Sequence, residues 1–178
     1  VFSVFPKEFL NPLKKYDSKG LITFDATLKG NIGKNNLPKI EANFSLEQGA
    51  LTEKNTGISL QNLSFNGQFS NQNKQINSLL ILNNIQGKFS NNGGNFDGQI
   101  TLKDFANLKI ESQVNANLNL AVVKDFITIE SIKELTGTAT TNYQLKGSIV
   151  NEKFKIQQSQ GTLSFNNLNL ATTSNNLT

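Results

Sequence analysis

The side chains of this chain that could do chemistry are carboxylates, lysines, hydroxyls and amides. Its 178 residues include 13 acidic and 17 basic residues, every basic one a lysine, and no histidine, cysteine, methionine or tryptophan. The absence of histidine and cysteine excludes Ser-His-Asp and Cys-His nucleophiles and removes the usual zinc ligands. Arginine, the side chain best suited to hold a phosphate with two parallel hydrogen bonds, is absent too. We therefore expect no metal and no cofactor.

Paired carboxylates are the remaining combination typical of an enzyme, in this case a glycoside hydrolase. Alternation predicts Glu41 and Glu47 on one polar strand face and Glu111 on another such face. Nothing in their spacing indicates two carboxylates facing each other across a cleft, so charges on a solvated sheet face are the simpler interpretation. The chain also lacks the Gly-x-x-x-x-Gly-Lys-Ser/Thr phosphate loop. We predict that the chain is not an enzyme.

Charge and polar composition give little indication of a charged partner. The formal net charge is +4, the lysines are scattered, and their longest run is Lys14-Lys15. Nucleic-acid binding favours a basic stripe with interleaved aromatic residues, so we expect no nucleic-acid partner. Asparagine is abundant and often paired, which indicates solvated strand faces and turns. The pairs are Asn35-Asn36, Asn83-Asn84, Asn91-Asn92, Asn166-Asn167 and Asn175-Asn176.

Strict alternation of apolar and polar residues is the main structural signal. A strand has a side-chain period of two, so each alternating segment predicts a strand with one apolar and one polar face. Segments 22–29, 40–47 and 108–120 all carry apolar or small residues at even positions. We expect the first two to be antiparallel neighbours with their apolar residues on the same face. The candidate apolar-face residues are Ile22, Phe24, Ala26, Leu28, Ile40, Ala42, Phe44, Leu46, Leu108, Ile110, Val114, Ala116, Leu118 and Leu120.

The chain as a whole predicts an all-β fold with one or two short helices. Helices are expected at 6–16, where Pro12 limits the length, and at 119–134. Glycines predict turns or bulges between and within the strands, among them Gly49, Gly67 and Gly87. Strands are expected at 21–33, 39–53, 57–71, 75–91, 95–104, 107–120, 137–150, 153–160 and 161–173.

Part of the pattern repeats. The arrangement Gly20-(7)-Leu-Lys-Gly30 recurs as Gly137-(7)-Leu-Lys-Gly147, at a constant offset of 117 positions (137 − 20 and 147 − 30). Self-similarity at a fixed period is typical of arrays in which each unit stacks on its neighbour. We therefore predict one module at 1–134 and the start of a second at 135–178, able to stack on adjacent repeats of the same chain. We also expect the sequence to be a piece of a longer protein.

These motifs, in this order, resemble the C-terminal repeat region of AsmA-like proteins, of the AsmA/TamB type. The likeness covers nearly the whole chain; each motif alone is weak, and their order and spacing are more specific. The chain departs from the family pattern at Ala106, where proline is common, and at Asn119, where aspartate is common. The segments that carry the resemblance are Pro6…Leu13…Tyr16…Gly20, Pro38-Lys-Ile40-Glu-Ala42-Asn-Phe44, Ile58-Ser-Leu60-Gln-Asn62-Leu63-Ser-Phe65-Asn-Gly67, Gly98-Gln-Ile100-Thr-Leu102-Lys-Asp104-Phe105 and Leu118-Asn-Leu120 with Phe126.

The resemblance implies an elongated antiparallel sheet of repeated modules, bent into an open U-shaped groove. It implies a periplasmic protein anchored to the inner membrane by a segment outside this sequence. The implied partners are phospholipid acyl chains, carried in the apolar groove for transport between the inner and outer membranes and for outer-membrane homeostasis. On this interpretation the fourteen apolar-face residues contact lipid.

Two other interpretations remain open on the residues alone. Alternating strands commonly fill the core of a closed β-sandwich, in which case the same apolar residues are sealed from any ligand. The Asn-rich faces and the phenylalanines also suit an extracellular adhesin or a carbohydrate-binding β-domain, although such sites favour exposed Trp and Tyr. The chain has no Trp and two Tyr.

Overall fold

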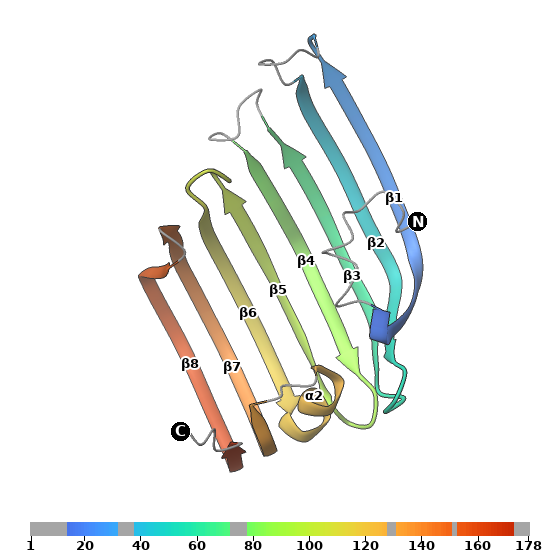
Figure 1. Cartoon of the computed structure of the whole chain (residues 1–178), viewed down its shortest axis with the longest axis vertical. Helices are drawn as coiled ribbons and strands as arrows, with labels where there is room; N and C mark the ends of the chain where they lie inside the picture. Colours follow the sequence, from blue (N-terminus) through green and yellow to red (C-terminus); the bar gives the residue numbers. More distant parts are fainter. Residues whose placement is uncertain (1–13, 32–37, 72–77, 128–130, 151–152, 173–178) are drawn as a thin grey trace, which may run out of the picture.

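The computed structural model describes residues 14–31, 38–71, 78–127, 131–150 and 153–172. Over these ranges the chain forms one eight-stranded antiparallel sheet in which every strand pairs with the next in sequence, as Figure 1 shows. One helix, α2 (Leu120–Ile127), joins the sixth strand to the seventh. The strands are β1 (Tyr16–Lys29), β2 (Lys39–Glu53), β3 (Ser59–Ser70), β4 (Leu79–Phe89), β5 (Gly94–Lys103), β6 (Lys109–Asn119), β7 (Ile132–Val150) and β8 (Lys153–Thr172).

The pairing of β1 with β2 confirms the register expected from alternation. Phe24 lies opposite Phe44 and Ala26 opposite Ala42, and the other members of the two apolar sets are paired in the same way. Directly opposed residues of an antiparallel pair share a face, so both sets lie on one side of the sheet.

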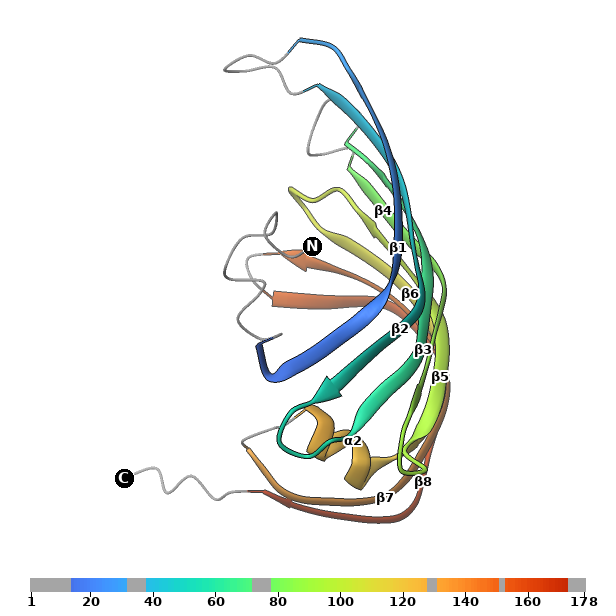
Figure 2. The same cartoon turned by 90° about the vertical axis from the view of Figure 1, so that its right-hand side faces the viewer.

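The sheet is open rather than closed into a sandwich. β1 and β8 are its two edges, and no second sheet covers it within the described residues. Seen from the β1 side, the strands bend together and give the sheet a concave face, on which α2 lies (Figure 2). The all-β expectation is confirmed in this form, and the closed-sandwich alternative does not describe these strands.

Bulges at asparagine and glutamine accompany the bending of the strands. Gln48, Asn62, Asn84 and Asn167 have φ angles of 51–53° and coincide with register shifts in β2, β3, β4 and β8. A residue inserted in this left-handed conformation bends its strand and increases the local twist, and asparagine tolerates that conformation better than most residues. Part of the asparagine content therefore has a backbone role.

Three boundaries differ from the sequence prediction. The predicted helix at 119–134 begins correctly but ends early, because Ile132 already opens β7. The predicted strands 153–160 and 161–173 are one strand, since β8 runs through Gly161, whose φ of 145° is one that residues with a side chain rarely adopt. Of the predicted helix at 6–16, residues 6–13 lie outside the described residues, and Tyr16 begins β1.

The predicted module boundary falls inside a strand. Residue 134 lies in β7, which pairs with β6 from residue 138 to residue 148, so the sheet runs on across the boundary. The two copies of the glycine motif also differ in setting: Gly30 follows the end of β1, whereas Gly147 lies within β7. The division into modules stays a prediction.

The helix α2 packs on one end of the concave face and forms the main hydrophobic cluster. Phe126 is buried against Ile58, Leu60 and Phe89, and Val122 packs on their edge. The Phe126 and Phe89 rings meet edge to face with centroids 5.2 Å apart, a favoured aromatic geometry. None of the helices in the described ranges has the length and apolarity needed to cross a bilayer.

Candidate functional site

The concave side carries an apolar surface that crosses all eight strands; we call it the apolar face. Its middle is built by residues that the register places side by side. One row, read from β1 to β8, consists of Phe24, Phe44, Gly67, Leu82, Ile100, Ser112, Leu145 and Ser159. A second row, read in the same direction, consists of Ala26, Ala42, Phe69, Leu80, Leu102, Ile110, Gly147 and Ile156. Seven interstrand spacings of about 4.8 Å make each row roughly 34 Å long.

Glycines inside the strands make room for phenylalanine rings from neighbouring strands. A Cβ placed on Gly67 would lie 2.1 Å from the Phe44 ring, and one on Gly87 would lie 2.9 Å from that of Phe96. Gly67 is in regular register with both neighbouring strands, so the expectation of a turn or bulge there is wrong, whereas Gly87 is in register with Phe96 but faces the register shift of β3. The rings lie over the glycine backbone, which keeps the apolar face continuous.

The apolar face is most exposed towards the two edges of the sheet. In β1, Phe24 is 67% exposed, and in β8 Leu163 is 57% exposed. Ile22, Leu28, Phe165 and other large apolar side chains of the edge strands are also exposed. Contiguous apolar surface of this kind is uncommon on soluble proteins and marks a site for a partner or ligand.

One side of the trough, the hollow of the concave face that runs from β1 to β8, is bounded by α2, which is tied to the start of the chain's first strand. The Tyr16 hydroxyl donates a hydrogen bond of 2.9 Å to the Phe126 carbonyl, and Lys15 Nζ donates one of 2.5 Å to the Ile127 carbonyl. These carbonyls end the helix and lack partners within it, so Lys15, just before β1, and Tyr16, its first residue, satisfy them. Residues some 110 positions apart thereby fix the helix over the sheet.

The charged groups with perturbed pKa values serve the scaffold and not the apolar face. A hydrogen bond from Lys39 lowers the pKa of Glu41, and one from Lys103 lowers that of Glu111, both on the opposite face. Glu53 is 1% exposed and accepts hydrogen bonds from the Thr56 and Asn55 backbone N–H groups, the first of which chiefly lowers its pKa. It thereby organises the turn between β2 and β3, next to the α2 cluster.

The predicted apolar-face residues fall into three groups. The β1 and β2 sets and Ile110, Val114 and Ala116 of β6 lie on the apolar face, with Val114 37% exposed. Leu118 is partly covered by the α2 cluster, and Leu120 begins α2 and is buried. Leu108 precedes β6, which begins at residue 109. The predicted strand 107–120 is thus too long by two residues at its start and one at its end.

The sequence prediction missed most of the apolar face on β3, β4, β5 and β8. In β8 the apolar residues move from odd to even sequence positions at a bulge. Leu163 and Phe165 precede the bulge, and Leu168 and Leu170 follow it. A strict period of two therefore fails across the strand. The Asn166-Asn167 pair, at the point where the parity changes, was the available signal.

Comparisons with protein-family models, curated proteins and solved structures find no match to this chain. In the described part of the chain, no three acidic, histidine or cysteine side chains lie close enough together to hold a metal ion. The geometry of the apolar face is therefore the basis for a functional proposal.

Proposed function

We propose that this chain is a non-enzymatic segment of an AsmA-like periplasmic protein whose apolar face shields the acyl chains of phospholipids passing between the inner and outer membranes. The observation that carries the proposal is the open, concave apolar face, exposed at both edges of the sheet. The family and the compartment rest on the sequence motifs described above, and the anchor would lie outside this sequence.

The energetic requirement for moving a lipid matches what this face offers. Transfer of an acyl chain from a bilayer into water costs about 0.8 kcal/mol per CH₂, which is on the order of 12 kcal/mol for a chain of roughly 16 carbons. A carrier must replace that water with apolar surface. Phenylalanine, leucine and isoleucine side chains in adjacent strands supply such a surface without a catalytic group.

The trough is also long enough. Each row of the apolar face extends roughly 34 Å from β1 to β8, and the hydrocarbon core of a bilayer is about 30 Å thick, or about 15 Å per leaflet. One acyl chain therefore fits within the eight strands. The exposed apolar side chains of β1 and β8 leave both ends of the trough open, as a conduit requires.

A charge introduced on the apolar face tests this proposal. Val114→Asp and Ala116→Glu place a carboxylate in the trough, and Asn117→Asp places one on the opposite face of the same strand as a matched control. Transfer of a fluorescent phospholipid between donor and acceptor vesicles is the measurement. We expect the first two variants to fold and to transfer lipid at least tenfold more slowly, and the control to match the parent.

Two results would contradict the proposal. Folded Val114→Asp and Ala116→Glu variants that transfer lipid as well as the parent would show that acyl chains do not use this face. If both variants unfold while Asn117→Asp remains folded, these apolar side chains serve the stability of the sheet and not the shielding of acyl chains.

A further inference from the structure

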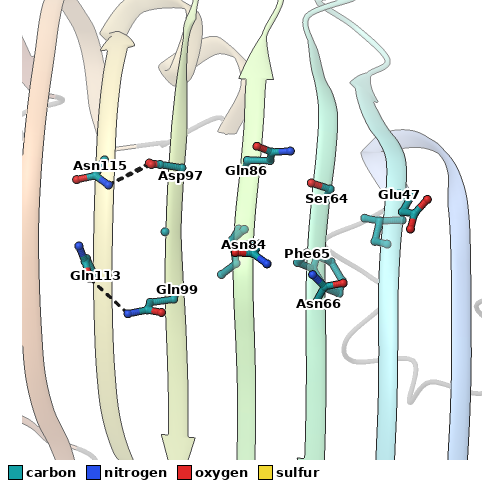
Figure 3. A pocket seen from close by; sticks show the side chains of 13 residues that line it. Glu47, Ser64, Phe65, Asn66, Asn84, Gln86, Asp97, Gln99, Gln113 and Asn115 are labelled. Carbon is teal, nitrogen blue, oxygen red and sulfur yellow. Dashed lines mark hydrogen bonds between the residues drawn. The ribbon is translucent and has the colours of Figure 1, made fainter.

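The face opposite α2 carries a second surface, built from amides instead of hydrocarbon. Two hollows of about 630 and 190 Å³ lie on it, and both are lined by Gln99 and Gln113. Together they form one groove, here called the polar groove, from Glu47 in β2 to Gln158 in β8. Figure 3 shows its side chains on adjacent strands of the sheet.

The register arranges these side chains in two parallel ladders. In one ladder, Gln99, Gln113 and Gln144 are directly opposed across β5, β6 and β7, and Gln160 of β8 continues the row. The other ladder runs through Ser64, Gln86, Asp97, Asn115 and Asn142 on β3 to β7. Neighbouring rungs are about 4.8 Å apart, and the ladders lie two residues apart along each strand.

Most of the hydrogen-bonding capacity of the ladders is unused by the protein. Asn115 Nδ2 donates to the Asp97 carboxylate at 3.0 Å, and Gln99 Nε2 donates to Gln113 Oε1 at 3.4 Å. Among the described residues, no hydrogen bond joins the side chain of Gln86 or Gln144 to another protein group. Each primary amide offers two donors and one acceptor oxygen, so the groove presents a regular array of both.

The charge of the groove restricts the ligand. Its ionisable lining residues are Glu47, Asp97, Glu111 and Lys146, three negative and one positive. This balance repels polyanions such as nucleic acids. The amides between these charges are uncharged donors and acceptors, which an uncharged hydrogen-bonding ligand matches.

We infer that the polar groove binds an elongated, uncharged, polyhydroxylated chain, of the neutral oligosaccharide class, laid across the strands from β2 to β8. Amide oxygens and N–H groups exchange hydrogen bonds with the ligand hydroxyls at each rung. The contacts of this site are those of the amides and carboxylates, because Leu46, Phe65 and Ile85, although they border the larger hollow, lie in register on the apolar face. This site is separate from the apolar face and does not depend on lipid binding there.

Titration calorimetry of the full 178-residue chain with cellohexaose, chitohexaose and maltohexaose tests the inference, with hexalysine as the counter-probe. We expect at least one hexasaccharide to bind, and hexalysine not to. The double variant Gln113→Ala/Gln144→Ala should bind it about tenfold more weakly, the loss expected for two net hydrogen bonds. Gln68→Ala, an exposed amide on the same face outside the groove, should bind like the parent.

Three outcomes would overturn the inference. They are no binding by any hexasaccharide, equal binding by the double variant and the parent, and binding of hexalysine alone, which would assign the groove to a basic peptide. The NMR chemical shifts of the backbone amides of the parent provide a second measurement, which does not depend on the fold of the variant. On addition of the bound hexasaccharide, shifts should change at residues 97, 99, 113 and 115, and their absence there would contradict the site.

Discussion

Removing the Phe126 side chain should release α2 from the sheet. Phe126 is 6% exposed, and its ring contacts Tyr16 with centroids 4.9 Å apart and Phe89 with centroids 5.2 Å apart. Phe→Ala at a buried site of this kind costs about 3–5 kcal/mol of unfolding free energy, from lost burial and the cavity left behind. We expect Phe126→Ala to fall in that range.

Equilibrium unfolding in urea measures this cost. With an m-value of about 2 kcal/mol/M, a loss of about 4 kcal/mol lowers the midpoint by about 2 M. The chain has no tryptophan and two tyrosines, Tyr16 beside Phe126 and Tyr143 in β7, so tyrosine fluorescence follows both regions, and circular dichroism follows the sheet.

Phe105→Ala is the matched control. Phe105 is 42% exposed and, within the described ranges, contacts one ring, that of Phe69, with centroids 6.1 Å apart. Its loss should cost less than that of Phe126, about 1–2 kcal/mol, because a large part of its surface is already in water. Equal midpoints for the two variants, or a loss below about 1 kcal/mol for Phe126→Ala, would refute the assignment of α2 as a packed wall of the trough.

Three further predictions concern the backbone and the turns. Gly67→Ala should destabilise the fold by about 1–3 kcal/mol because the added Cβ meets the Phe44 ring. In a double-mutant cycle measured by urea unfolding, Phe44→Ala should remove most of that cost, and independent effects of the two substitutions would contradict the contact. Asn62→Ala should cost about 1 kcal/mol in the same assay because φ is 52° there, whereas Asn62→Gly should cost little; equal losses would count against the bulge. The pKa of Glu53 is lowered from its ordinary value of 4.5, chiefly by the Thr56 N–H, so its stabilising effect is present above that value and lost as the pH falls through the lowered pKa. Glu53→Gln should therefore flatten the acid limb of stability against pH, and an unchanged acid limb would contradict this role.

Alternation in the sequence predicted the parts of the sheet where the pleat is regular. The β1–β2 register follows from it directly, because Phe24 and Phe44 lie in uninterrupted runs of period two. The start of α2 at Leu120 was also predictable, but its end was not. Residues Ile132 and beyond carry apolar periodicity compatible with helix or strand, and pairing with β8 decides for strand.

The bulges explain why most of the apolar face was missed. A single residue inserted at Asn84 or Asn167 moves every following side chain to the other parity, so a fixed period loses the face at that point. The polar groove was missed for a different reason. Its glutamine ladder depends on the register between four strands, and no short-range pattern in the sequence encodes that alignment.

The most direct test of lipid shielding uses two adjacent positions on one strand. Leu163 lies on the apolar face of β8 and Ser164 on the opposite face, and both are exposed. A photo-crosslinking amino acid is placed at one position or the other, and the chain is incubated with phospholipid vesicles before irradiation and mass spectrometry. We predict phospholipid adducts from position 163 and few or none from position 164. Equal adducts from both positions, or none from position 163, would contradict the proposal that the apolar face carries acyl chains.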